Sequence, residues 1–291
     1  MVDNFIAIPF ALQDMSHQLI DLCGATSYIL SDAEVPLHSP FRTVLKCLID
    51  FVKNSHAQER AKIERAHLVK VRTLMPEVIF PGPEGRLEGR YHPQKERDAP
   101  IAIILHPHPQ FGGTMNHKVV HSMHYAFYNM GFTVLRFNFR GVGRSQGEYD
   151  QGIGELSDAA SALDYLQSMN NNSKHCWVAG FSFGAWIGMQ LLMRRPEITG
   201  FISASPPANM YDFSFLAPCP ASGLIINGTA DRVAPPADTT TLVNKLHEQK
   251  GITITHTEVE GAGHFFEEPH LDTLMDHTTT YVKRRLTETS R

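Results

Sequence analysis

Two serines in this chain lie between glycines in a pattern that suits nucleophilic catalysis: Ser145 in residues 143–147 and Ser182 in residues 180–184. Ser182 follows an apolar, strand-like run and leads directly into a helix-like segment, 183–195. On such a turn a serine exposes its hydroxyl, because flanking residues without a Cβ permit the strained backbone. Ser145 is followed by glycine-rich, acidic sequence that does not begin a helix at once. The pattern therefore predicts Ser182 as the nucleophile and Ser145 as a loop residue.

A base and a carboxylate should follow the nucleophile along the chain. A serine hydroxyl is a weak nucleophile at neutral pH and needs an imidazole base, which a carboxylate holds in the correct tautomer. Asp231 comes just after the apolar run 222–227, where a buried parallel strand would end. His264 ends the glycine-rich stretch 261–264, after another strand-like segment. The order Ser, Asp, His occurs in one class of serine triads, so we expect Ser182, Asp231 and His264 to be catalytic.

Donors for a developing oxyanion should lie on both sides of the nucleophile. One is expected to be the backbone N–H of Phe183, the residue after the serine. The other should come from the loop 106–114, His-Pro-His-Pro-Gln-Phe-Gly-Gly-Thr, in which the two prolines have no N–H. His108 is therefore the expected second donor, with Gln110 or Phe111 as alternatives. Two such preorganised donors would stabilise the tetrahedral intermediate.

Histidines near this loop raise the question of a metal site. His117, His121 and His124 are spaced to share one face of a helix, not far along the chain from His106 and His108. A metal site here would need a carboxylate or cysteine ligand as well, and the sequence nearby contains neither. We expect polar histidines on a helix face, with no metal and no cofactor.

Composition limits the partners. The net charge of -4 does not indicate the strongly basic surface that binding to nucleic acid or to an anionic membrane would need. The four cysteines are widely separated, which indicates a reduced, cytoplasmic setting, and no apolar run approaches the roughly 20 residues of a membrane helix. We expect a small, uncharged substrate, no nucleic-acid or membrane partner, and leave a homo-oligomer open.

From Met75 onward, short apolar strands alternate with helical segments. An antiparallel hairpin is expected at 78–80 and 86–91, further strands at 101–105, 132–137, 175–179, 222–227 and 252–259, and helices at 116–129, 154–169, 183–195, 237–250 and 270–286. This alternation predicts an α/β fold with a mostly parallel central sheet covered by helices on both faces. The interval 200–216 is too short for a large inserted lid.

The first 74 residues differ in character. A helix is expected from Ser39-Pro40, with Phe41, Val44, Leu45, Leu48 and Val52 on one face. We expect residues 75–291 to form the catalytic domain and residues 1–74 to be an N-terminal extension. It is either an added helical arm, as a cover over the open site or a subunit contact, or the result of a start placed upstream of Met75. In both cases we expect the extension to be dispensable.

Taken together, these motifs resemble those of the α/β-hydrolase superfamily. The resemblance rests on the elbow around Ser182, Gly-Thr-Ala-Asp231, Gly-Ala-Gly-His264, the His106 loop and the segment Asn138–Ser145. It covers about residues 75–287 and is strongest toward compact bacterial dienelactone-hydrolase-like and carboxylesterase-like members. Dienelactone hydrolases proper use a cysteine nucleophile, and here the elbow carries serine.

The resemblance implies roles and an activity. By this resemblance, Ser182 corresponds to the family's nucleophile, Asp231 to its acid and His264 to its base. Arg140 and Ser145 correspond to a structural loop. The expected function is cofactor-free hydrolysis of small or medium carboxylic esters through an acyl-serine. A serine peptidase of the prolyl-oligopeptidase kind, a thioesterase and an acyltransferase would share the triad. Outside enzymes, the same fold could serve as a ligand-sensing module.

Overall fold

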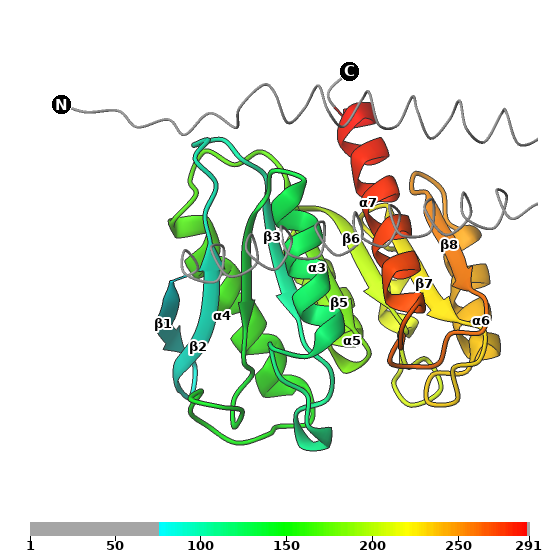
Figure 1. The fold of residues 1–291 in the computed structure, drawn as a ribbon, viewed down its shortest axis with the longest axis horizontal. Coiled ribbons are helices and arrows are strands. Elements are labelled where there is room, and N and C mark those ends of the chain that lie inside the picture. The colour runs from blue at the N-terminus through cyan, green and yellow to red at the C-terminus, as the bar shows by residue number, and fades with distance from the viewer. Residues whose placement is uncertain (1–75, 290–291) are drawn as a thin grey trace, which may run out of the picture. The chain divides into compact units, whose positions relative to one another are not determined.

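The structure is a computed structural model that describes residues 76–289 (Figure 1). The chain divides into the units Met1–Thr73 and Leu74–Arg291. The predictions made for residues 1–74 and for a start at Met75 lie outside the described residues. Between residues 76 and 289 no helix is long and apolar enough to cross a membrane.

In the described part of the chain, eight strands form one sheet in the order β1-β2-β4-β3-β5-β6-β7-β8. Their bounds are β1 Glu77–Gly82, β2 Gly85–His92, β3 Ile101–Leu105, β4 Thr133–Phe137, β5 Cys176–Phe181, β6 Ile198–Ala204, β7 Gly223–Gly228 and β8 Ile254–Val259. β1 and β2 form an antiparallel hairpin, and β2 runs antiparallel to β4. All other neighbours are parallel, so the loops that follow β3 to β8 emerge at one edge of the sheet.

Helices cover both faces of this sheet (Figure 1). They are α3 Lys118–Asn129, α4 Ile153–Ser168, α5 Phe183–Arg194, α6 Pro236–His247 and α7 His270–Thr289, with short 3-10 turns η1 Pro109–Phe111 and η2 Ser214–Leu216. Apolar side chains of α4, α5 and α6 share one core, and those of α3 and α7 share the other. β3 contributes to both cores, because its alternate residues point to opposite faces of the sheet. Ile103 belongs to the first core and Ile104 to the second.

The predicted fold is confirmed, with one correction. The sequence predicts no strand in the interval 200–216, but its first residues belong to β6, a strand between β5 and β7. β6 is buried except for Thr199. Thr199, Gly200 and Ser203 interrupt its apolar run, which hid the strand from sequence patterning. The remaining link from β6 to β7 holds only η2, so it carries no inserted lid.

Ser145 has a structural position in the loop after β4. Its hydroxyl donates to the carbonyl oxygen of Asn138 at 2.6 Å and accepts from the N–H of Glu88 at 3.0 Å. The same loop is fixed by a buried ion pair between Arg140 and Asp158, with Nη2 and Oδ1 2.8 Å apart. Ser145 thus joins the β4 loop to β2.

Replacing Ser145 by alanine should destabilise the fold. The change leaves a buried carbonyl and a buried N–H without their partner, which costs about 1–3 kcal/mol of unfolding free energy. Ser157→Ala is the matched control, because that hydroxyl is exposed and bonds only within α4; its effect should stay within about 0.5 kcal/mol. Urea denaturation measures both, and equal losses would contradict the structural role of Ser145.

Candidate active site

Ser182 lies on the tight turn between β5 and α5. Its backbone is left-handed, with φ 55° and ψ -121°, a conformation that costs a non-glycine residue about 1–3 kcal/mol. The surrounding structure holds it there: the N–H of Ser182 donates to the carbonyl oxygen of Ala204, at the end of β6, at 2.9 Å. The hydroxyl thereby stands above the carboxyl-end edge of the sheet.

The two glycines of this turn are required by close backbone approach. A Cβ on Gly180 would lie 2.2 Å from the carbonyl oxygen of Gly184. A Cβ on Gly184 would lie 2.4 Å from the carbonyl oxygen of Leu105 and 2.6 Å from that of His106. The start of α5 therefore packs directly on the end of β3, where the His-Pro-His-Pro loop begins.

The structure brings Ser182, His264 and Asp231 into one hydrogen-bonded line. His264 Nε2 lies 3.0 Å from Ser182 Oγ, and His264 Nδ1 lies 2.8 Å from Asp231 Oδ2. All three residues are buried, with exposed fractions of 8%, 6% and 3% for the serine, histidine and aspartate. The serine and the aspartate are separated from the histidine by 82 and 33 positions in the chain, so only the sheet brings them together.

Backbone hydrogen bonds tie the loop that carries Asp231 to the loop that carries His264. The N–H of Ala230 donates to the carbonyl oxygen of Ala262 at 3.0 Å. The N–H of Gly261 donates to Thr229 Oγ1 at 2.8 Å. Gly228 permits this approach, since a Cβ there would lie 2.1 Å from the Ala262 carbonyl oxygen. The carboxylate and the imidazole are thus positioned as one unit.

The expected oxyanion donors differ in what their N–H groups do. The Gln110 N–H donates to His108 Nδ1 at 3.2 Å, and the Phe111 N–H donates to the His108 carbonyl oxygen at 3.1 Å. Both alternatives are therefore engaged inside η1. The N–H groups of His108 and Phe183 have no hydrogen-bond acceptor within residues 76–289, and the two rings lie 4.9 Å apart between centroids.

Comparison with known proteins identifies the family. An uncharacterised protein of Rickettsia prowazekii (strain Madrid E) is 53% identical over 196 residues, which are 66% of this chain and 82% of that protein. A protein of unknown function from Agrobacterium tumefaciens, described as a candidate α/β hydrolase, matches at TM-score 0.71 and 67% identity over 73% of this chain and 97% of its own. A structure from Xanthomonas campestris, described as an α/β serine hydrolase without lid, matches at TM-score 0.66 and 31% identity over 73% and 95% of the two chains.

The chain belongs to the α/β-hydrolase superfamily. It is a serine hydrolase, and, like the Xanthomonas campestris structure, it has no lid in its described part. The family model of X-Pro dipeptidyl-peptidases (S15 family) matches residues 89–231. That match includes Ser182 and Asp231 and ends before His264.

Asp231 is held as a carboxylate in this hydrolase. Burial alone would raise the pKa of Asp231, but hydrogen bonds from His264 and from the N–H groups of Ala234 and Val233 outweigh it and keep the pKa below its ordinary value. Those two N–H groups donate to Oδ1 at 2.8 and 2.9 Å. Oδ2 is thereby left for the imidazole, whose Nδ1–H it accepts.

His106 supports the oxyanion loop in the neutral form. Its Nε2 accepts the N–H of Phe139 at 3.0 Å, so Nδ1 carries the proton and donates to the Pro107 carbonyl oxygen at 2.6 Å. Burial lowers the pKa of this fully buried imidazole to about 3. His106 therefore connects the loop after β3 to the loop after β4 without adding a charge.

The expected polar histidine face on α3 is wrong for two of its three members. His117 caps the N-terminus of α3, because its Nδ1 accepts the N–H of Val119 at 3.3 Å. His124 is buried, and its Nε2 lies 3.3 Å from Nδ1 of His92. The cap made by His117 is a local contact, whereas tertiary packing decided the position of His124. Among the described residues, no group of three or more His, Cys, Asp or Glu side chains could hold a metal ion.

An aromatic wall stands on one side of the nucleophile, formed by His108, Tyr149, Phe183, Trp186 and Tyr211. Ring centroids lie 5.0 Å apart for His108–Tyr149, 5.7 Å for Phe183–Trp186, 5.9 Å for Phe183–Tyr211 and 4.2 Å for Trp186–Tyr211. Sequence reasoning missed Tyr149, Trp186 and Tyr211, because three separate loops and helices supply them and no spacing connects them.

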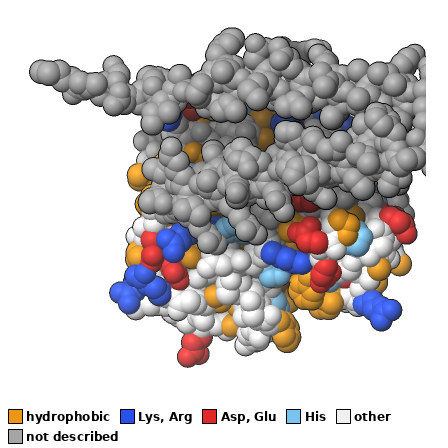
Figure 2. All heavy atoms as spheres, viewed as in Figure 1, with side chains coloured by type: hydrophobic (Ala, Val, Ile, Leu, Met, Phe, Trp, Pro, Cys, Tyr) orange, Lys and Arg blue, Asp and Glu red, His pale blue; other side chains and the backbone are white. Residues whose placement is uncertain are grey.

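Exposed apolar side chains surround the site. Of the large apolar residues exposed in the described region, five follow β3, β4, β6, β7 and β8 at the carboxyl-end edge. This apolar rim consists of Phe111, Ile153, Met210, Val233 and Phe265. On the part of the molecule that Figure 2 shows uncovered, Lys and Arg side chains lie among Asp and Glu and do not gather in one patch.

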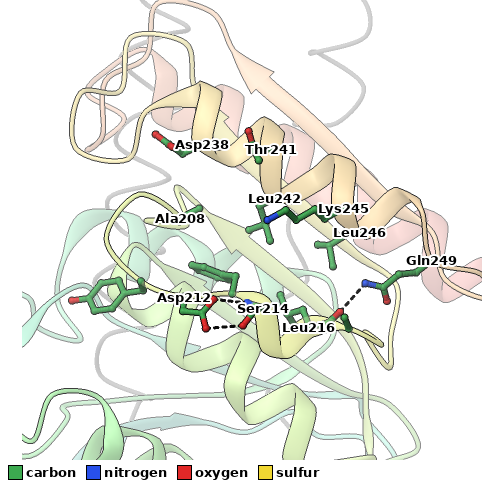
Figure 3. A pocket seen from close by; sticks show the side chains of 13 residues that line it. Ala208, Asp212, Ser214, Leu216, Asp238, Thr241, Leu242, Lys245, Leu246 and Gln249 are labelled. Carbon is green, nitrogen blue, oxygen red and sulfur yellow. Dashed lines mark hydrogen bonds between the residues drawn. The ribbon is translucent and has the colours of Figure 1, made fainter.

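A separate cavity of about 310 Å³ lies between α6 and the η2 segment (Figure 3). Leu216, Leu242 and Leu246 form part of its lining, and no triad residue does. Asp212 accepts two hydrogen bonds from Ser214 beside it. Tyr211 lines this cavity and also belongs to the aromatic wall.

Acid should destabilise this hydrolase through His106. The unfolded imidazole has a pKa near 6.5 and the folded one about 3, so the unfolded state binds the extra proton and stability falls as the pH drops below about 6.5. Each such group contributes a slope of about 1.4 kcal/mol per pH unit between the two values. His106→Gln keeps an acceptor for the Phe139 N–H and removes the titrating imidazole. Between pH 6 and pH 4 the unfolding free energy of this variant should therefore fall less steeply than that of the wild type, by about 1.4 kcal/mol per pH unit. Urea denaturation at several pH values measures this, and parallel curves would refute it.

Proposed function

We propose that this α/β hydrolase cleaves uncharged carboxylic esters through an acyl-serine at Ser182. The observation that carries the proposal is the continuous line from Ser182 Oγ through both nitrogens of His264 to Asp231 Oδ2. Asp231 fixes the proton on Nδ1, so Nε2 is the lone-pair nitrogen that faces the serine. This is the arrangement in which an imidazole acts as general base.

In the first step, His264 Nε2 takes the hydroxyl proton as Ser182 Oγ attacks the ester carbonyl. The carbonyl oxygen becomes an oxyanion, which the free N–H groups of Phe183 and His108 would bind. The imidazolium then gives its proton to the leaving alkoxide, the carbon–oxygen bond breaks and the alcohol departs. Asp231, kept ionised, stabilises the imidazolium.

In the second step, water attacks the acyl-serine. His264 Nε2 removes a proton from the water, a second tetrahedral oxyanion forms at the same donors, and the proton returns to Ser182 Oγ as the acid leaves. Every proton transfer uses this one imidazole.

The surroundings favour an uncharged substrate. The apolar rim presents hydrocarbon side chains to an approaching substrate, and such exposed apolar patches commonly mark binding surfaces. The link between β6 and β7 is short, so a small or medium ester reaches Ser182 without the displacement of a lid. The net charge of -4 opposes anionic esters.

Peptide cleavage is the second candidate, because the S15 family model matches residues 89–231. A peptidase that reads the amino end of a peptide needs a carboxylate for the ammonium group. Glu155, beside the Tyr149 loop, already accepts the N–H groups of Asp150 and Gly152 and is fully buried. Glu155 is therefore not available to an ammonium group.

A parallel screen separates the candidates. Wild-type protein is assayed with neutral acetate and benzoate esters, the matching thioesters, and aminoacyl-proline amides, and is also treated with a fluorophosphonate. We expect labelling at Ser182 and turnover of the esters. Amide turnover above ester turnover would replace the proposal by the peptidase, and labelling with no turnover of any substrate would favour a ligand-sensing module.

Triad variants should separate the three roles. Ser182→Ala and His264→Ala should abolish ester turnover, and Asp231→Asn should lower kcat by about 10⁴ through the wrong imidazole tautomer. Ser145→Ala is the control, because its hydroxyl bonds to Asn138 and Glu88; the rate per folded molecule should be unchanged. Steady-state kinetics on folded protein measure all four. Loss of activity in Ser145→Ala together with activity in Ser182→Ala would overturn the assignment of the nucleophile.

A further inference from the structure

One wall of the cavity between α6 and the η2 segment is a single face of α6. Side chains three or four positions apart are neighbours on a helix surface, and the helix residues that line the cavity follow that spacing. A strip of about two turns of α6 therefore faces the cavity (Figure 3). It consists of Asp238, Thr241, Leu242, Lys245 and Leu246.

The middle of the cavity is apolar. Leu242 and Leu246 on the strip are buried, and so is Leu216 on the opposite wall. Gln249, just beyond the end of α6, joins the two walls, because its Nε2 donates to the carbonyl oxygen of Leu216 at 2.7 Å. The volume of about 310 Å³ is at the lower end of the range for small-molecule sites. The cavity therefore suits a small ligand with hydrocarbon side chains.

The strip carries two charged groups of opposite sign, Asp238 near its start and Lys245 about two turns later. Neither side chain makes a hydrogen bond or an ion pair with another described residue. Seven residues of an α-helix rise about 10 Å. Helical side chains lean toward the N-terminus, and Figure 3 shows the long Lys245 side chain directed back along α6. The two charges are therefore closer to each other than their backbones are.

A third charged group in the lining, Asp212, belongs to the opposite wall and is already engaged. Its Oδ1 accepts the N–H of Ser214 at 2.8 Å, and its Oδ2 accepts the Ser214 hydroxyl at 2.6 Å. These hydrogen bonds, together with the positive charge of Lys245, keep the pKa of Asp212 below its ordinary value. Asp212 is therefore ionised at neutral pH, and its charge attracts the ammonium group of Lys245.

The charges and the apolar middle together specify the ligand. The carboxylates of Asp212 and Asp238 oppose a ligand that carries only a carboxylate, and Lys245 opposes a ligand that carries only an ammonium group. A zwitterion satisfies both conditions. A free amino acid carries both of its charged groups on one carbon, whereas two extended residues span about 7 Å. The longer span fits the separation of Asp238 and Lys245 along the strip.

We propose that this cavity binds an apolar dipeptide, with the peptide's ammonium group at Asp238 and its carboxylate at Lys245. The two apolar side chains of the peptide lie against the leucines between these charges. No triad residue lines the cavity, so the site is distinct from the one around Ser182 and does not depend on the proposed ester hydrolysis. The ligand is small and both charged groups are reached by water, so we expect a dissociation constant on the order of 0.1–1 mM.

Calorimetric titration of the full-length protein with leucyl-leucine tests the proposal. N-acetyl-leucyl-leucine lacks the ammonium group and leucyl-leucine amide lacks the carboxylate, so both should bind more weakly than leucyl-leucine. Asp238→Asn should weaken leucyl-leucine about threefold, as expected for one solvent-exposed ion pair, and leave the binding of the N-acetyl peptide unchanged. Lys245→Gln should weaken leucyl-leucine by a similar factor and leave the binding of the amide unchanged.

Glu248→Gln and Lys250→Gln are the matched control variants. Both side chains are exposed, follow the end of α6 and do not line the cavity, so the dissociation constant should stay as in the wild type. Equal weakening in the control variants would mean that only net charge matters, and would overturn the proposal. Binding that neither Asp238→Asn nor Lys245→Gln changes would place the peptide elsewhere and overturn it too. So would an analogue that binds as tightly as leucyl-leucine, or the absence of binding well above the expected dissociation constant.

Discussion

The close approach of α5 to the end of β3 is the constraint on which the site depends. Gly184 lies so near the carbonyl oxygens of Leu105 and His106 that no side chain fits between them. This contact sets the distance between the elbow and the oxyanion loop. It also holds Ser182 in a left-handed conformation that an isolated peptide would avoid. Packing of a parallel sheet thus supplies the free energy that keeps Ser182 in this strained conformation.

The rest of the site is assembled at the same edge by loops that bond to one another. The β7 and β8 loops share backbone hydrogen bonds around Ala230 and Ala262, so Asp231 and His264 keep a fixed separation. His106 joins the β3 loop to the β4 loop in the same way. Because these contacts fix the loops, the polar groups of the proposed triad are held in place in advance. Such preorganisation of polar groups is a main source of electrostatic catalysis in enzymes.

Neutral histidines that are buried or half-buried hold backbone segments in place at two points of this structure. His106 and His117 have pKa values lowered to about 3 and about 4, mainly by burial, and each accepts a backbone N–H through a ring nitrogen. They position backbone close to His264 without placing a second positive charge beside its imidazolium. His106 and His117 thus act as uncharged connectors close to His264, the proposed base.

The sequence by itself predicted the α/β architecture and the set Ser182, Asp231 and His264 that the structure brings together, because glycine spacing and strand-to-helix order are local properties of the chain. It proposed His108 but could not separate it from Gln110, since that choice depends on which N–H groups η1 engages. It missed β6, whose burial comes from its place between β5 and β7. It also missed the aromatic wall and misplaced His124. Those features arise where distant segments meet, and only the packed sheet decides which side chains share that space.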